Sequence, residues 1–401
     1  MILLNIMFGL SQSLPYIIFM NIGTLLGLSI GIYGFYKFED ILNYFKVDNK
    51  PKTIIKYIAA ILLFLSCLSF KSLSCIIAIH FALAFIFVDI IGFIYGLIFR
   101  NKEENEESLE NKKDTKPLKF IPKLQKSGIL AITIFLILII SGIYGINHIE
   151  ETDYYIHSNK INKSYTVLFI SDTHYDTIQD TELFKNEIKN MNNLKPDIVI
   201  LGGDLVDDGT PEESMKELFS EIKKINSTYG IYYIYGNHDR TMRINSETNE
   251  SQTAKSNNHD DDLNKTIEEN GIKILCDDKI DINKDIILIG REDKGFSADS
   301  GRLSSEELLN NVDLSKYIII ADHQPVESEK NTILGADLQV SGHTHGGQIF
   351  PLNIIYSLIG TLNYGEHKFG KMSQITSSGV AGWGWPLKNA NPCEYVIIHI
   401  N

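Results

Sequence analysis

The chain of 401 residues is long enough for more than one structural unit, and its formal net charge of −13 is unevenly spread. Residues 1–147 hold 14 Lys and Arg against 10 Asp and Glu, whereas residues 148–401 hold 23 against 40. Because an acidic surface repels polyanions, the second part is disfavoured as a nucleic-acid binder. The four cysteines, Cys67, Cys75, Cys276 and Cys393, show neither zinc-ribbon spacing nor a disulfide framework.

Four apolar segments in the first third are long enough to cross a bilayer, whose core needs about 20 apolar residues of helix. These segments are Tyr16–Tyr36, Thr53–Phe70, Ser74–Phe99 and Gly128–Ile146. The first 36 residues contain no Lys or Arg, so we expect the first segment to be retained as a span rather than removed as a signal peptide. Gly23, Gly27 and Gly31 recur at four-residue spacing, which predicts close helix packing within this bundle.

The Lys and Arg residues of the short loops predict the orientation of these spans. The loops after the first and third segments hold four and eight such residues, whereas the loop between the second and third holds only Lys71. Since positively charged loops stay in the cytoplasm, the chain after the fourth span should lie outside it. The sequence predicts a multi-pass protein of the cell membrane, with a bundle of four transmembrane helices in residues 1–147 and an extracytoplasmic domain in residues 148–401.

From Tyr165 onward, short apolar runs end in polar clusters that contain Asp, Asn or His. Five runs have this form: Tyr165–Ile170, Asp197–Leu201, Ile231–Tyr235, Tyr317–Ile320 and Ala336–Val340. Helix-like segments, Thr181–Asn192 and Pro211–Ile225, separate the first three, as in an α/β domain with buried strands. A single His after a strand is more often an ordinary turn residue. Five such clusters favour one site, because functional groups gather beyond the carboxyl ends of the strands.

The clusters supply nitrogen and oxygen donors without a thiolate: Asp172, His174, Asp204, Asn237, His323, His343 and His345. A mixed set of this kind suits Mn, Fe, Zn or Co. Seven groups are too many for one tetrahedral ion, but they fit two divalent metal ions that share a carboxylate. Two ions roughly 3.5–4 Å apart can hold a hydroxide and two phosphoryl oxygens. The set therefore favours hydrolysis of a phosphate ester.

The motif order DxH, GDxxD, GNHD, H and GHxH resembles that of the calcineurin-like metallophosphoesterases, over about residues 160–401. The string DLQVSGHTHGGQI, with SSGV and WGxP after it, resembles their membrane-attached bacterial branch more specifically. The resemblance implies an α/β fold built on a β-sandwich flanked by helices. It assigns one ion to Asp172, His174, Asp204 and His345, and the other to Asp204, Asn237, His323 and His343.

The resemblance also implies a catalytic role for two residues that are not ligands. His238 would donate a proton to the leaving oxygen or stabilise its charge, and Asp207 would orient it. Asp208 stands where the protein phosphatases of the wider superfamily have a phosphate-binding Arg, which favours phosphodiesters or pyrophosphates as substrates. A lipid head group or an envelope precursor at the membrane would be such a substrate.

Two other functions stay open at this point. One is a broad phosphomonoesterase or nucleotidase, and the other is a non-catalytic sensor or transport-associated metal-binding module. The polar tract Arg240–Asn270 is expected to be a mobile insertion near the site.

Overall fold

The structure is a computed structural model that describes residues 2–401 except 71, 107–119, 208, 240–257 and 296–300. The chain forms two compact units, Met1–Ser141 and Gly142–Asn401. The boundary lies six residues before the one predicted from the sequence. The reason is that the end of the last apolar helix packs in the second unit, where the backbone of Gly142 meets the Leu387 side chain.

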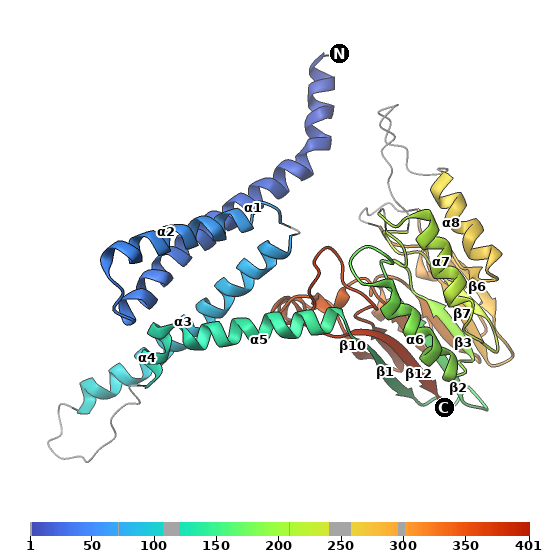
Figure 1. Cartoon of the computed structure of the whole chain (residues 1–401). Coiled ribbons are helices and arrows are strands. Elements are labelled where there is room, and N and C mark those ends of the chain that lie inside the picture. Colours follow the sequence, from blue (N-terminus) through green and yellow to red (C-terminus); the bar gives the residue numbers. More distant parts are fainter. Residues whose placement is uncertain (1, 71, 107–119, 208, 240–257, 296–300) are drawn as a thin grey trace. The chain divides into compact units, whose positions relative to one another are not determined.

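The first unit is helical. Its helices are α1 (Ile2–Tyr44), α2 (Asn49–Ser66), α3 (Leu73–Glu106), α4 (Phe120–Ser127) and α5 (Ile129–Ile146), of which α5 ends in the second unit (Figure 1). The predicted glycine packing is confirmed. A Cβ atom on Gly23, Gly27 or Gly31 would lie 2.6, 2.7 or 3.0 Å from the carbonyl oxygens of Cys67, Phe64 and Ala60 respectively, so α1 approaches α2 through this face.

Each of the four predicted spans falls on a helix, but among the described residues only two of these helices are long and apolar enough to cross a membrane. These two stretches are Leu73–Ile98 and Ile129–Ile146. The second segment differs from its prediction because its helix begins at Asn49, with Lys50, Lys52 and Lys56 in it, and ends at Ser66. The first and second spans therefore stay predictions.

The second unit contains two six-stranded sheets. In order across the first sheet the strands are β1 (Ile149–Ile156), β12 (Cys393–Ile400), β2 (Tyr165–Ile170), β3 (Ile198–Leu201), β4 (Ile231–Tyr233) and β5 (Lys273–Ile274). Across the second they are β10 (Gly365–Phe369), β11 (Met372–Thr376), β9 (Leu338–Ser341), β8 (Tyr317–Ala321), β7 (Ile286–Gly290) and β6 (Asp278–Asp281).

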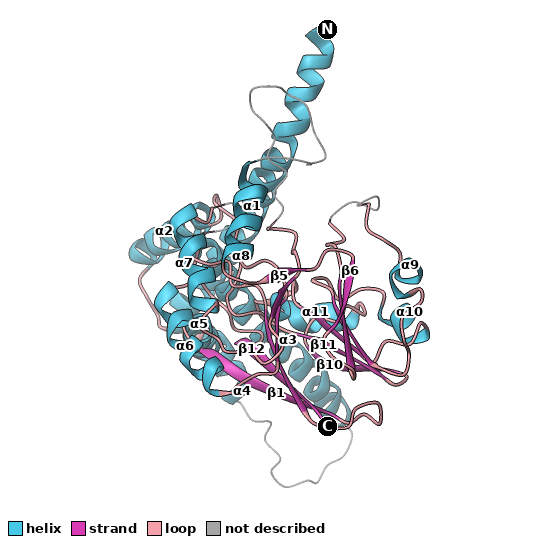
Figure 2. Cartoon of the chain, turned by 90° about the vertical axis from the view of Figure 1, so that its right-hand side faces the viewer, coloured by secondary structure: helices cyan, strands magenta, loops and turns pink. Residues whose placement is uncertain are grey.

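Helices cover the outer faces of the two sheets, as Figure 2 shows. The helices of this unit are α6 (Thr181–Asn193), α7 (Glu212–Ile222), α8 (Asn258–Glu269), α9 (Ser305–Leu309), α10 (Ser328–Ile333), the 3-10 turn η1 (His345–Gly347) and α11 (Leu352–Leu358). The predicted strands are buried on both faces. In β2, Val167 and Phe169 join the core between the sheets, whereas Leu168 and Ile170 join the core beneath α6 and α7. The predicted β-sandwich with flanking helices is therefore the observed fold.

The prediction of a mobile insertion over Arg240–Asn270 is wrong for its last part. Residues 240–257 lie outside the described part of the chain, but α8 begins at Asn258. Leu263 and Ile267 are buried in the core that α6 and α7 share. Their four-residue spacing places both on one helix face, which is the signal that the polar composition of the tract concealed.

Candidate metal centre

The loops that carry the donor residues have an unusual backbone. Asp172 and His174 follow β2, Asp204 follows β3, and His343 and His345 follow β9; all five have φ between +36° and +69°. A left-handed conformation costs a non-glycine residue about 1–3 kcal/mol, and it persists only where the surrounding structure holds it. Five of the seven predicted ligands are therefore held in strained turns at the same edge of the sandwich, which points to a functional role.

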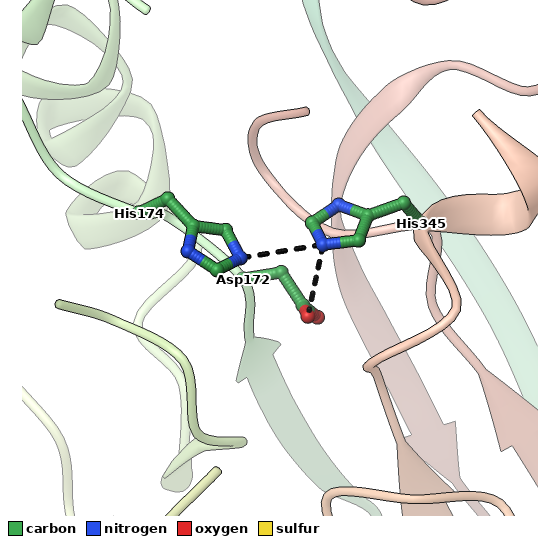
Figure 3. A group of neighbouring side chains, drawn as sticks. All are labelled: Asp172, His174 and His345. Carbon is green, nitrogen blue, oxygen red and sulfur yellow. Dashed lines mark hydrogen bonds and ion pairs between the residues drawn. The ribbon is translucent and has the colours of Figure 1, made fainter. Parts of the chain in front are cut away.

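Asp172, His174 and His345 form the first donor group (Figure 3). All three side chains are buried, and their donor atoms lie within 4.8 Å of one another. The Nε2 atoms of His174 and His345 are 3.3 Å apart, and Nε2 of His345 is 3.7 Å from Oδ1 of Asp172. The three residues come from loops that are 171 residues apart in the sequence, so the sandwich assembles this group.

Asp204, His323 and His343 form the second donor group, again with donor atoms within 4.8 Å of one another. Oδ2 of Asp204 is 3.2 Å from Nε2 of His323 and 3.9 Å from Nε2 of His174. Asp204 therefore lies beside ligands of both groups, which is the position that a bridging carboxylate requires. The structure thus brings six of the seven predicted ligands into two adjoining groups.

Hydrogen bonds fix how the imidazoles face the centre. Nδ1 of His323 lies 2.8 Å from the carbonyl oxygen of Gly202, and Nδ1 of His345 lies 3.2 Å from that of Ala381. Because a carbonyl oxygen only accepts, each Nδ1 must carry the proton, and each Nε2 is turned toward its donor group. Partners of this kind orient a metal ligand and set its tautomer.

The donors fit transition-metal ions in their chemistry as well as in their placement. Oδ1 of Asn237 is buried and has no hydrogen-bond partner among the described residues, whereas Nε2 of His323 lies 3.2 Å from Oδ2 of Asp204. A buried polar atom without a partner is costly, and a cation would supply the missing interaction for Asn237. Mixed imidazole, carboxylate and amide donors match Mn, Fe, Zn and Co, as the sequence predicts.

Burial and neighbouring charges shift the pKa values of these groups. Burial lowers the pKa of His345 to about 3, which leaves its imidazole neutral and ready to bind a cation. Burial alone would raise the pKa of Asp204, but the imidazole of His323 lowers it below its usual range. Asp204 in turn raises the pKa of His323 against the effect of burial. A proton on His323 and a metal ion would therefore compete for the same nitrogen.

His238 and Asp207 lie beside the donor groups as a connected pair. Nδ1 of His238 is 3.2 Å from Oδ1 of Asp207, whose Oδ2 is 3.3 Å from Nδ1 of His174. Burial would raise the pKa of Asp207, but these two imidazoles lower it, so the carboxylate stays charged between them. The His238 ring is partly exposed and stands 5.2 Å from the ring of Trp383. Asp207 is thus placed to orient a ligand as well as the predicted proton donor.

Asp239 has a larger structural part than its place at the end of the GNHD motif suggests. Its Oδ2 accepts hydrogen bonds from the backbone N–H groups of Asp204 and Gly236, both at 2.7 Å. Its Oδ1 accepts from those of Leu205 and Val206 at 3.1 and 3.3 Å. This buried carboxylate ties the loop after β3 to the loop after β4. The sequence gives no signal for that role, because three of the four N–H donors belong to backbone more than 30 residues away.

A further support comes from Lys388 in the segment before β12, a residue for which the sequence predicts no role. The fully buried Lys388 donates from Nζ to the carbonyl oxygens of Ser378, Gly379 and Ala381. Gly379 lies against the first donor group, where an added Cβ would be 2.5 Å from Cβ of Asp172. Ala381 holds His345 through its carbonyl oxygen. Lys388 therefore shapes the wall behind two of the donors.

A buried ion-pair network stands behind His323. Arg302 makes a two-pronged contact with Asp322, at 2.9 and 2.6 Å, and it also pairs with Glu327 at 2.9 Å. Arg291 lies 3.3 Å from the same Glu327 carboxylate. Both guanidinium groups are thus engaged with carboxylates of their own network.

Comparisons with known proteins agree with the observed centre. The family model described as calcineurin-like phosphoesterase matches residues 165–347, which include every predicted ligand. A protein of Helicobacter pylori named "Uncharacterized metallophosphoesterase" is 29% identical over 329 residues, covering 78% of this chain and 80% of that protein.

Two further relatives carry more specific names. The "Probable glycerophosphodiester phosphodiesterase GpdQ" of Arcobacter nitrofigilis is 33% identical over 171 residues, covering 40% of this chain and 58% of its own length. The "Transmembrane protein with metallophosphoesterase domain" of Bos taurus is 25% identical over 250 residues, covering 58% of this chain and 52% of its own length. The chain thus spans between about half and four fifths of these relatives. With its two donor groups inside the matched region, residues 165–347 form a calcineurin-like phosphoesterase domain, the domain of a metal-dependent phosphoric ester hydrolase.

Proposed function

We propose that this protein is a membrane-anchored phosphoesterase that uses two divalent metal ions to hydrolyse a phosphodiester or pyrophosphate bond. The observation that carries the proposal is the pair of adjoining donor groups with Asp204 beside both. Ions held there would polarise the phosphoryl group and make water a better nucleophile. Asp172, His174 and His345 would hold one ion, and Asn237, His323 and His343 the other, with Asp204 shared.

His238 is proposed as the group that protonates the leaving oxygen. Its ring is partly exposed at the edge of the donor groups, and its backbone N–H donates to Oδ1 of Asp204 at 2.7 Å. The carboxylate of Asp207 stabilises the protonated imidazole through its Nδ1 side, so that Nε2 would be the nitrogen presented to substrate. Asp207 is accordingly a positioning residue in this proposal.

Charge favours a diester or a pyrophosphate over a monoester. A phosphate monoester carries a second negative charge near neutral pH, which a phosphatase neutralises with cationic side chains. The two arginines behind His323 are engaged by Asp322 and Glu327, and Asp208, outside the described residues, cannot serve as a cation. The name of the Arcobacter nitrofigilis relative, a glycerophosphodiester phosphodiesterase, points in the same direction.

The membrane part of the proposal rests on the helical unit. Two of its helices are long and apolar enough to span a bilayer, and the bovine relative is named as a transmembrane protein. We propose four spans within residues 1–147, with the loops 37–52 and 100–126, rich in Lys and Arg, in the cytoplasm. The phosphoesterase domain would then lie outside the cytoplasm, where lipid head groups and envelope precursors are available as substrates.

The test uses the full chain in detergent, stripped of metal and then reloaded with Mn. Hydrolysis of bis(p-nitrophenyl) phosphate is compared with that of p-nitrophenyl phosphate. We expect metal-dependent cleavage with preference for the diester, and loss of roughly 100-fold or more in His238→Ala, the scale of general acid catalysis. The loss should be larger with diphenyl phosphate, because phenolate is a stronger base than p-nitrophenolate and needs the proton more.

Two variants complete the design. Asp204→Asn should lose bound metal as well as activity, whereas His157→Ala, which lies outside both donor groups, should keep both. Preference for the monoester would contradict the diester assignment. Absence of turnover on either ester, with two metals shown to be bound, would contradict the enzymatic role itself.

A further inference from the structure

The phosphoesterase domain exposes one concentrated apolar surface, on and around α11. Of the 11 large hydrophobic side chains exposed among the described residues from Gly142 on, five lie between Phe350 and Ile359. Leu358 is 80% exposed and Ile359 is 70% exposed. We call this set, Phe350, Ile354, Ile355, Leu358 and Ile359, the α11 face. An apolar surface of this kind marks an interaction site when its members are contiguous.

The segment around the α11 face also carries no charge. Residues 346–365 contain no Asp, Glu, Lys, Arg or His, although the domain as a whole is strongly acidic. Moving this uncharged stretch of 20 residues out of water would therefore not require the desolvation of any charged side chain. Binding at the boundary between lipid head groups and acyl chains grows with the apolar area buried there, and the α11 face offers such area without a charged side chain to desolvate.

The α11 face is held rigidly to the metal centre. The turn η1 contains the ligand His345, and a Cβ on Gly347 in that turn would lie 2.6 Å from the backbone nitrogen of Asn353 in α11. The backbone N–H of Phe350 donates to Oδ1 of Asn389 at 2.8 Å. Whatever covers the α11 face is therefore brought close to the donor groups.

Residues 387–389, which include Asn389, also contact the end of α5, one of the two candidate membrane spans. The backbone N–H of Lys388 donates to the carbonyl oxygen of Gly142 at 3.0 Å, and Leu387 packs against the Gly142 backbone. Nε2 of Gln348 donates to the carbonyl oxygen of Leu387 at 3.2 Å. Residues 387–389 thus join α11 on one side to the end of α5 on the other. Ile143 and Tyr144, on that last turn of α5, are exposed as well.

We propose that the α11 face lies in the surface of the bilayer that α5 enters, and that it holds the metal centre at the level of lipid head groups. The occupant of this surface is the lipid bilayer, because the apolar segment is continuous with a membrane span through residues 387–389. The inference rests on the proposed function and makes its substrate a phosphoester carried by a lipid.

A fluorescence experiment tests the contact directly. The full chain, on a Cys276→Ser background that removes the exposed thiol, receives an environment-sensitive NBD label at Leu358→Cys. Ile333→Cys serves as the matched control, since Ile333 is 83% exposed but lies outside the α11 face. In lipid nanodiscs with one copy per disc, we expect blue-shifted emission and quenching by spin-labelled phosphatidylcholine at position 358 only.

The result should hold in purely zwitterionic phosphatidylcholine and change little with salt, because no charge takes part. Equal quenching at positions 333 and 358, or none at 358, would overturn the proposal. A blue shift that requires two copies per disc would identify a second copy of the chain as the occupant and would overturn it too.

A kinetic experiment connects the contact to the reaction. The Leu358→Ser, Ile359→Ser double variant is assayed in nanodiscs on bis(p-nitrophenyl) phosphate and on dioleoylphosphatidyl-p-nitrophenol, which release the same product. We expect unchanged turnover of the soluble diester and at least about five-fold lower turnover of the lipid diester, as partial loss of interfacial burial would give. Equal turnover of the lipid diester by both proteins would contradict the inference. Failure of the unsubstituted protein on both diesters would instead contradict the proposed function.

Discussion

Replacing Asp239 by Asn is expected to weaken the loop that carries Asp204, the proposed shared ligand. Each oxygen of the Asp239 carboxylate accepts two backbone N–H groups. In Asn one of these oxygens becomes an NH₂ group, which itself donates. Two buried N–H groups are then left facing a donor, whichever way the amide is turned.

The structure gives the size of the effect. A buried polar group left without its partner costs about 1–3 kcal/mol, so two such groups should lower the free energy of unfolding by about 2–6 kcal/mol. The N–H of Asp204 is one of the four groups that Asp239 accepts, and its carboxylate is the proposed ligand shared by both donor groups. Loss of a partner that orients a ligand typically lowers metal affinity about 10–100-fold, and we expect a loss on that scale for Mn.

Urea unfolding of the full chain measures the first quantity. The two tryptophans of the chain are Trp383 and Trp385, so their fluorescence reports on the phosphoesterase domain and not on the helical unit. The matched control is Asp180→Asn at the start of α6, where an exposed carboxylate accepts one N–H, from Glu182, at 3.0 Å. Since Asn caps a helix about as well as Asp, this control should change stability by only a few tenths of a kcal/mol. An equal effect of the two substitutions would refute the assigned role of Asp239.

Three other substitutions test separate parts of the centre. Gly342→Ala would place a Cβ 2.2 Å from Oδ2 of Asp172, so the bound metal measured by elemental analysis should fall from two ions toward one. The control is Gly209→Ala, whose Cβ would have no atom within 4 Å, and it should keep both ions. Lys388→Met leaves the carbonyl oxygen of Ser378 without its lysine donor and should lower the free energy of unfolding by about 1–3 kcal/mol in the same urea assay; no change would refute its structural role. The pKa of Glu327 is lowered, since the two neighbouring guanidinium groups outweigh the opposite effect of burial. A carboxylate with a lowered pKa stabilises the fold at pH values above its ordinary pKa of 4.5, and this contribution is lost as the pH falls further. The melting temperature of metal-free Glu327→Gln should therefore decline less steeply below pH 4.5 than that of the unsubstituted protein.

The donor residues could be predicted from the sequence because each cluster follows a buried strand directly. Apolar runs such as Tyr165–Ile170 identify the strand, and the geometry of a sheet then brings the ends of such strands together. The same logic could not find Asp239 or Lys388 as supports. Their partners are backbone groups on other segments, and a backbone N–H or carbonyl has no signature in the amino-acid sequence.

Seven of the twelve strands in the described part of the chain escaped prediction, and β1 and β12 did so for different reasons. β1, Ile149–Ile156, carries charged residues because it forms the edge of its sheet and only its ends are buried. β12, Cys393–Ile400, is almost wholly buried, but Glu394 and His399 interrupt its apolar run, so its composition does not mark it as a buried strand. Hydropathy alone predicts the number of membrane spans, and it does not show where each helix begins and ends. The position of α2, which begins at Asn49 and so includes three lysines, could therefore not be predicted.

The position of β12 has a consequence for how the protein is made. β12 is inserted between β1 and β2, pairing in parallel with one and antiparallel with the other, so residues near 395 complete the sheet that residues near 150 begin (Figure 1). During synthesis, the helical unit leaves the ribosome long before this strand does. The phosphoesterase domain therefore stays incompletely folded, with the edges of β1 and β2 that face β12 unpaired, until residues near 400 have left the ribosome. Such long-range closure folds slowly and exposes strand edges to aggregation, so a chain cut before Cys393 should be recovered as degraded or aggregated protein rather than as a folded domain.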